Sequence, residues 1–214
     1  MSRAESHYGI FVDAFLRGRA IQRESGAGAS TAPASELPLH YFKRVVLLAR
    51  IQWALGVLHS IQPADLLDIG SGRGKFLWPL LDAFPTLPVT ATDFNSRRVY
   101  DLAAVHLGGV ERLSVRQADA THLPFADRSF DVVTMLEVLE HIPAAASALS
   151  EAVRVARRYV LLSVPSKPDE NPEHIHLFTE DDLRAQLAEL GVTQVKVQQA
   201  PGHWLALANV MHVV

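Results

Sequence analysis

The sequence predicts an α/β protein with a seven-stranded, mostly parallel sheet, helices on both faces and an antiparallel hairpin at the C-terminus. Three observations lead to this fold class. From residue 65 onward, short apolar segments alternate with helix-like segments, as in parallel sheets covered by helices. Two strand-like segments follow one another at the end of the chain, which predicts the hairpin. Apolar residues make up 49% of the 214 positions, which is enough for one buried core.

The first 62 residues precede this pattern. We expect them to form a helical lid beside a main domain of residues 63–214. Apolar residues recur at helical spacing over 10–15, and apolar residues surround most of the helix predicted over 39–59. Between them, 25–38 is rich in glycine, alanine, serine and proline, a composition typical of flexible linkers.

The main domain divides into strands and helices by hydrophobic pattern and by turn residues. Strands are predicted at 65–69, 88–92, 113–117, 130–135, 159–163, 192–199 and 204–213. Helices are predicted at 75–83, 96–107, 144–157 and 180–190. Open sheets of this kind bind ligands beyond the carboxyl ends of their strands, so the segments that follow the strands are where site residues are expected.

A glycine-rich loop, Gly70-Ser-Gly-Arg-Gly74, joins the first predicted strand to the helix after it. Its glycines permit positive φ angles and allow a ligand to lie against the backbone. A glycine-rich loop alone is weak evidence for a ligand, because tight turns use the same residues. The polar residues after the next three strands therefore decide the interpretation.

Acidic residues follow those strands. Asp93 ends the second strand, where a carboxylate can accept hydrogen bonds from both hydroxyls of a ribose. Asp119 ends the third, where it can accept from an adenine amine. The fourth strand leads into Glu137, Glu140 and His141. Together with the loop, these positions outline a ligand shaped like adenosine.

On these residues, the sequence resembles the class I S-adenosylmethionine-dependent methyltransferases of the broad small-molecule type, from about Leu66 to Leu190. The resemblance implies a Rossmann-like fold, S-adenosylmethionine as cofactor, and methyl transfer to a small-molecule acceptor by in-line displacement. The residues that it implies for cofactor binding are Asp68, Gly70, Ser71, Gly72, Gly74, Asp93, Phe94, Asn95, Asp119, Ala120 and Glu137. A nicotinamide dinucleotide is the alternative cofactor, but its loop usually has the GxGxxG spacing.

The same resemblance implies roles for the N-terminal segment and for one histidine. Helices before the first strand commonly cover the active site in this fold, and five polar side chains there are candidates to reach the cofactor carboxylate or an acceptor: Tyr8, His40, Tyr41, Lys43 and Arg44. His141, with Glu140 beside it, is the candidate catalytic base because imidazole titrates near neutrality. The alternative is that His141 only holds its loop.

Two alternative functions remain open. Glu137, Glu140 and His141, with His174 or His176, resemble the metal-binding set of small-RNA 3′-terminal 2′-O-methyltransferases. A cofactor-binding regulatory protein without turnover is the other alternative. Lys and Arg total 20 against 23 Asp and Glu, a net charge of −3, so we expect no nucleic-acid partner. The Glu-x-x-Glu-His sequence is also frequent in methyltransferases without a metal, so we expect no metal ion.

The remaining expectations concern location and partners. The sequence has no cysteine, which suits a reducing compartment, and no apolar run approaches the roughly 18 residues of a membrane span. We therefore expect a cytoplasmic protein without a membrane partner. The pattern predicts neither the identity of the acceptor nor the oligomeric state.

Overall fold

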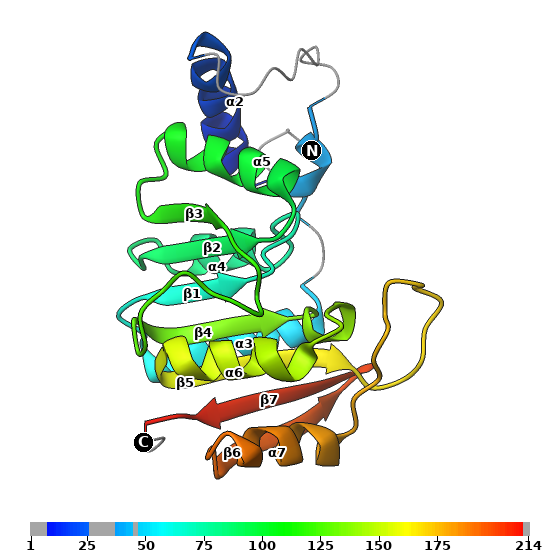
Figure 1. The fold of residues 1–214 in the computed structure, drawn as a ribbon. Coiled ribbons are helices and arrows are strands. Elements are labelled where there is room, and N and C mark those ends of the chain that lie inside the picture. The colour runs from blue at the N-terminus through cyan, green and yellow to red at the C-terminus, as the bar shows by residue number, and fades with distance from the viewer. Residues whose placement is uncertain (1–7, 26–36, 45–46, 212–214) are drawn as a thin grey trace.

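The fold contains a seven-stranded sheet, as the computed structural model of the chain shows for residues 8–25, 37–44 and 47–211 (Figure 1). The strand order is β3-β2-β1-β4-β5-β7-β6. The strands are β1 (Leu66–Ile69), β2 (Val89–Asp93), β3 (Leu113–Gln117), β4 (Phe130–Leu136), β5 (Ala156–Pro165), β6 (Gln194–Ala200) and β7 (His203–Asn209). The first five run parallel, whereas β7 pairs antiparallel with β5 and β6. The predicted fold class is confirmed.

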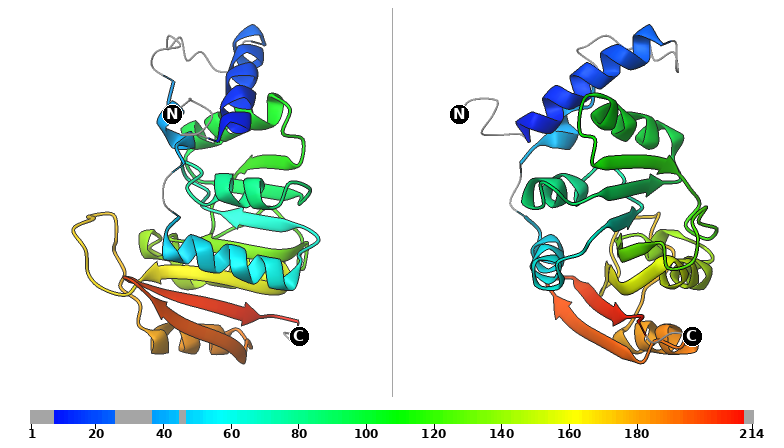
Figure 2. Two further views of the ribbon diagram at one scale, coloured as in Figure 1. Left: turned by 180° about the vertical axis from the view of Figure 1, so that it is seen from behind. Right: turned by 90° about the vertical axis from the view of Figure 1, so that its left-hand side faces the viewer.

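Helices cover both faces of the sheet (Figure 2). They are α2 (Gly9–Glu24), α3 (Ala49–Ile61), α4 (Leu77–Ala83), α5 (Ser96–Leu107), α6 (Ala145–Val155) and α7 (Glu180–Glu189), with short 3-10 helices η2 (Leu39–Phe42) and η3 (Leu139–His141). One apolar core joins α2, α3, α4 and α5 to the sheet, and a second joins α6 and α7 to it. The β1 residues are all buried because helices cover both sides.

The N-terminal helix α2 is fixed to α5 by close backbone contact and by a buried ion pair. A Cβ atom added to Gly18 would lie 1.7 Å from the carbonyl oxygen of Ala104, so only glycine allows this approach. Arg19 lies next to it, and its Nη1 is 3.1 Å from Oδ1 of Asp101 on α5. In Figure 1, α2 lies beyond α5 at the β3 end of the sheet. Helix α2 is therefore packed firmly against α5.

The segment before β1 departs from prediction. The structure has no continuous helix over 39–59: η2 ends at Phe42, Lys43 is extended, and α3 begins at Ala49. The reason is packing, because the buried Phe42 ring lies 4.7 Å from that of Trp78 on α4, measured between centroids. Most of the predicted linker 25–38 falls on residues 26–36, outside the described residues.

Candidate functional site

The glycine-rich loop follows β1, and its geometry requires glycine. Gly70, Gly72 and Gly74 all have positive φ angles, of 70°, 57° and 81°. A Cβ atom at Gly70 would lie 2.6 Å from a methyl carbon of Val138, and one at Gly74 would lie 2.2 Å from the Trp78 ring. A Cβ atom at Gly72 would have as its nearest neighbour the carbonyl oxygen of Gly70, 3.7 Å away. The loop therefore packs tightly at its two ends and is open at its centre.

A cavity of about 170 Å³ lies against this loop. Three parts of the chain line it: the start of α3, the loop itself and the end of β4. The lining residues are Arg50, Ile51, Asp68, Gly70, Ser71, Gly72, Arg73, Lys75, Phe76, Leu136 and Glu137. The cavity is thus at the carboxyl ends of β1 and β4, where open sheets bind ligands. Five of the residues predicted for cofactor binding lie in its wall.

Asp68 is buried beneath the loop and holds it in place. The hydroxyl groups of Ser71 and Thr134 each donate to its carboxylate at 2.7 Å. Burial raises the pKa of Asp68 to about 6, and these two hydrogen bonds offset part of that effect. At neutral pH the carboxylate is therefore charged, and it faces a cavity that also receives Arg50.

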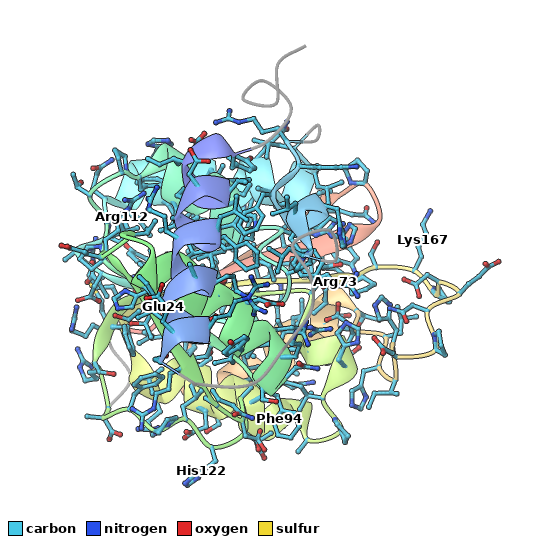
Figure 3. All side chains as sticks on the ribbon, turned by 90° about the horizontal axis from the view of Figure 1, so that it is seen from above. Glu24, Arg73, Phe94, Arg112, His122 and Lys167 are labelled. Atoms are coloured by element: carbon cyan, nitrogen blue, oxygen red, sulfur yellow. The ribbon has the colours of Figure 1, made fainter. Side chains whose placement is uncertain are left out.

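Asp93 ties the loop to β2. Its Oδ2 accepts from the backbone N–H of Gly72 at 2.8 Å, and its Oδ1 accepts from that of Asn95 at 2.9 Å. The carboxylate is 5% exposed, whereas the neighbouring Phe94 is 72% exposed at the surface, near the edge of the molecule in Figure 3. Asn95 caps α5, since its side chain accepts from the N–H groups of Arg97 and Arg98. These three residues lie beside the cavity, along the same sheet edge.

Asp119 and Ala120 lie in the loop after β3, next to the end of β2. The two strand ends are joined by a hydrogen bond from Nε2 of Gln117 to the carbonyl oxygen of Phe94, 2.9 Å long. The backbone N–H and the hydroxyl of Thr121 both donate to Oδ1 of Asp119, and they lower the pKa of that carboxyl group. Phe94 and Asp119 therefore occupy neighbouring loops outside the cavity wall.

Arg154 on α6 supports this loop, a role that the sequence pattern does not predict. Its guanidinium donates to the carbonyl oxygens of Phe125 and Leu123, at 2.8 and 3.1 Å. Glu151, which pairs with Arg154 at 2.6 Å, accepts from the N–H of Leu123. No local pattern marks this role of Arg154, because the carbonyl groups that it supports lie about 30 residues earlier in the chain.

Glu137 directly follows β4 and lies in the left-handed region, with φ of 60°. Its carboxylate accepts from the Ser163 hydroxyl at 2.7 Å and from Nε2 of His203 at 2.8 Å. The Arg50 Nε atom lies 3.8 Å from the same carboxylate. A non-glycine residue in this region costs about 1–3 kcal/mol, and these polar contacts from β5, β7 and α3 hold it there. The sequence pattern predicts Glu137 as a site residue but none of its three partners.

A second group of polar side chains lies just beyond Glu137. Glu140 is fully buried, and no donor among the described residues hydrogen-bonds to its carboxylate oxygens. Burial, followed by the nearby charge of Glu137, raises its pKa to about 8. One ligand atom from each of Glu140, His141 and His174 lies within 4.8 Å of the others. His176 lies apart, with Nε2 3.0 Å from the carbonyl oxygen of Ile142.

The polar residues expected from the N-terminal segment take other places. Arg44 pairs with Asp82 at 3.1 Å and stacks on Tyr8, whose pKa is raised by burial. Tyr41 does approach the cavity, since its ring centre is 5.5 Å from the guanidinium carbon of Arg73. The N-terminal cation in the cavity wall is Arg50, which the sequence analysis did not select.

No helix within the described residues combines the length and the apolar character needed to cross a membrane.

Comparison with known proteins finds similarity to methyltransferases. Residues 67–163 match the protein family described as "Methyltransferase domain". A malonyl-[acyl-carrier protein] O-methyltransferase of Geobacter sulfurreducens is 29% identical over 160 residues, which are 64% of this chain and 59% of that protein. A demethylmenaquinone methyltransferase of Deinococcus radiodurans is 32% identical over 160 residues, 70% of this chain and 62% of that protein. The chain thus spans about three-fifths of the length of either relative.

A solved structure shows that the fold is shared across nearly the whole chain. The magnesium protoporphyrin IX methyltransferase of Synechocystis, solved with bound S-adenosylhomocysteine, has a TM-score of 0.58 and 16% identity. The similarity covers 92% of this chain and 97% of that one.

Proposed function

Because residues 67–163 match the methyltransferase-domain family, we propose that this chain is a class I S-adenosylmethionine-dependent methyltransferase and transfers the methyl group of S-adenosylmethionine to a small-molecule acceptor. One observation carries the proposal. Two of the three positive-φ glycines, Gly70 and Gly72, line a cavity at the ends of β1 and β4, and Asp93 ties the centre of that loop to β2. A ligand there can lie against backbone and reach an acidic group at the next strand.

In methyl transfer, the acceptor atom attacks the sulfonium methyl in line with the carbon–sulfur bond. That bond breaks as the new one forms, and the products are S-adenosylhomocysteine and the methylated acceptor. A hydroxyl or amine acceptor also loses a proton. Since the sulfonium is already activated, the protein chiefly positions the two reactants and excludes water.

The predicted cofactor residues divide among three parts of the ligand in this proposal. Asp68, the loop of 70–74 and Glu137 hold the methionine portion, and Arg50 pairs with its carboxylate. Asp93 and Asn95 are at the ribose. Phe94 covers the adenine, whose edge lies at Asp119 and Ala120. The proposal is supported by the order of these residues along one sheet edge, from β1 and β4 through β2 to β3.

The methyl acceptor is assigned to the part of the site formed by the polar side chains that follow β4. We place Glu140 and His141 there, because they follow Glu137 directly and lie at the same edge of the sheet. The N-terminal segment 1–62 contributes the other wall, through Tyr41 and Arg50, while α2 anchors it on α5. The two relatives act, by name, on a malonyl-[acyl-carrier protein] and on a demethylmenaquinone. Their names support a metabolite-type acceptor for this chain.

The test is formation of S-adenosylhomocysteine, measured across a panel of carboxylic acids, phenols, quinols and amines with the full chain. We expect at least one acceptor to give turnover that saturates with S-adenosylmethionine and is lost in Asp93→Ala. Tight binding of the cofactor with no turnover on any acceptor would instead favour the regulatory alternative. Absence of binding would contradict the proposal as a whole.

A further inference from the structure

We propose that Glu140, His141 and His174 form a binding site for a divalent transition-metal ion. The three side chains come from η3 and from the loop 166–179 after β5, which projects beyond the carboxyl edge of the sheet (Figure 1). In Figure 3, Lys167 marks the outer part of this loop. The cluster lies apart from the glycine-rich loop, and none of its residues lines the cavity there.

The first support is the spacing of the donor atoms. One carboxylate oxygen and one ring nitrogen from each histidine lie within 4.8 Å of one another. Ligands at zinc–nitrogen and zinc–oxygen distances of about 2.0–2.2 Å are roughly 3.3 Å apart in a tetrahedral site. Small side-chain rotations would close the difference. The histidine rings are already adjacent, with centroids 4.7 Å apart.

The second support is the state of Glu140. Its side chain is completely buried, and both carboxylate oxygens are without a hydrogen-bond donor in the part of the chain that the structure describes. Buried carboxylates are normally paired, hydrogen-bonded or bound to a metal, because burying them otherwise is costly. A cation held beside Glu140 supplies the missing partner.

The third support is what lies behind the histidines. Nδ1 of His141 is 3.0 Å from the carbonyl oxygen of Glu173, and Nδ1 of His174 is 2.8 Å from Oδ2 of Asp169. The carbonyl oxygen at Nδ1 of His141 favours the Nδ1–H form of that ring, in which Nε2 keeps its lone pair. At His174 the Asp169 carboxylate is close to Nδ1 but forms no hydrogen bond with it. Metal-binding histidines usually have a carbonyl or carboxylate in this place, which fixes the tautomer and the ring orientation.

The donor set indicates the class of ion. Two imidazoles and one carboxylate suit Zn²⁺ and its neighbours in the first transition row, and three protein ligands leave a coordination position open. An oxygen atom of the acceptor could occupy that position and lose its proton more readily. This role depends on the proposed function, whereas metal binding does not. The inference reverses the expectation from the sequence, which favoured a site without metal.

The experiment is a Zn²⁺ titration of the untagged, chelator-treated full chain, followed by calorimetry and by the NMR signals of the histidine rings. We expect one ion per chain and perturbation of the His141 and His174 signals. Glu140→Gln and His174→Gln should each weaken binding by at least about tenfold. His176→Gln is the matched control in the same loop, and its affinity should equal that of the wild type.

Two results would overturn the proposal: no saturable binding to the wild type, or equal affinity in folded Glu140→Gln and His174→Gln. If a variant does not fold, a titration of the wild type with Co²⁺ tests the site without the variants. A visible absorption band that saturates at one Co²⁺ per chain and disappears on adding Zn²⁺ supports the site, and its absence contradicts it. None of these measurements uses S-adenosylmethionine, so their failure is separate from failure of the proposed methyl transfer.

Discussion

Nε2 of His203 lies 2.8 Å from Oε2 of Glu137, although 66 residues separate them in the sequence. His203 begins β7 and Glu137 directly follows β4, and β5 lies between these strands in the sheet. The contact therefore joins the antiparallel hairpin to the wall of the cavity. It also fixes a carboxylate whose backbone is in the left-handed region.

The first prediction concerns this pair. His203→Gln and Glu137→Gln should each destabilise the chain, and the double variant should lose less than the sum of the two. We expect a coupling free energy of at least about 0.5 kcal/mol, as for residues in one hydrogen-bonded network. Urea unfolding of the four proteins measures it. Strictly additive losses would show that the contact has no energetic weight.

The second prediction compares two arginines of the N-terminal segment. Arg50 lines the cavity, whereas Arg44 forms an exposed pair with Asp82. If Arg50 holds the cofactor carboxylate, Arg50→Gln removes a charge-assisted hydrogen bond worth about 1.5–3 kcal/mol. Its affinity for S-adenosylmethionine should fall by at least about tenfold, while Arg44→Gln binds as the wild type does. Calorimetry distinguishes them, and an equal effect of both changes would argue against this role for Arg50.

The third prediction is a pH dependence caused by Asp68. Its pKa is about 6 in the folded chain, against an ordinary value of 3.8. Between these values the folded state keeps a proton that the unfolded state has lost, so the free energy of unfolding falls as pH rises. Relative to Asp68→Asn, the wild type should lose about 3 kcal/mol in all between about pH 3 and pH 7, and the difference should then stay level.

Unfolding of both proteins by urea at several pH values tests this dependence. Comparing the two cancels contributions from the other carboxylates. A difference that does not change with pH, or that grows in favour of the wild type toward pH 6, would contradict the assignment.

Most of the fold could be predicted from the sequence, because alternating apolar and helical segments reflect a parallel sheet with two covered faces. The loop at Gly70–Gly74 was also predictable, since its backbone conformation allows only glycine at the tight positions. The break after η2 was not, because it depends on where Phe42 packs against Trp78. Hydrophobic periodicity does not contain that information.

The site was predictable in part, and the missing residues share a cause. Arg50, His203 and Arg154 act through partners that lie far away in the sequence, and no short motif marks such pairs. The sequence does not show which of His174 and His176 joins the polar cluster. The path of one loop decides this, because it places His174 beside Glu140 and His176 against Ile142. Conversely, Asp93 and Asp119 were found because each directly follows the end of a strand.

The central claim is that the carboxyl edge of this sheet binds S-adenosylmethionine with Asp93 at the ribose. Its most direct test is calorimetric titration of the cofactor into the wild type, Asp93→Ala and the control Asp13→Asn, which changes an exposed acid on α2. We expect one cofactor per chain, and the loss of hydrogen bonds worth about 1.5–3 kcal/mol should weaken binding to Asp93→Ala by at least about tenfold. Asp13→Asn should bind like the wild type. No binding to the wild type, or unchanged affinity in a folded Asp93→Ala, would contradict the claim.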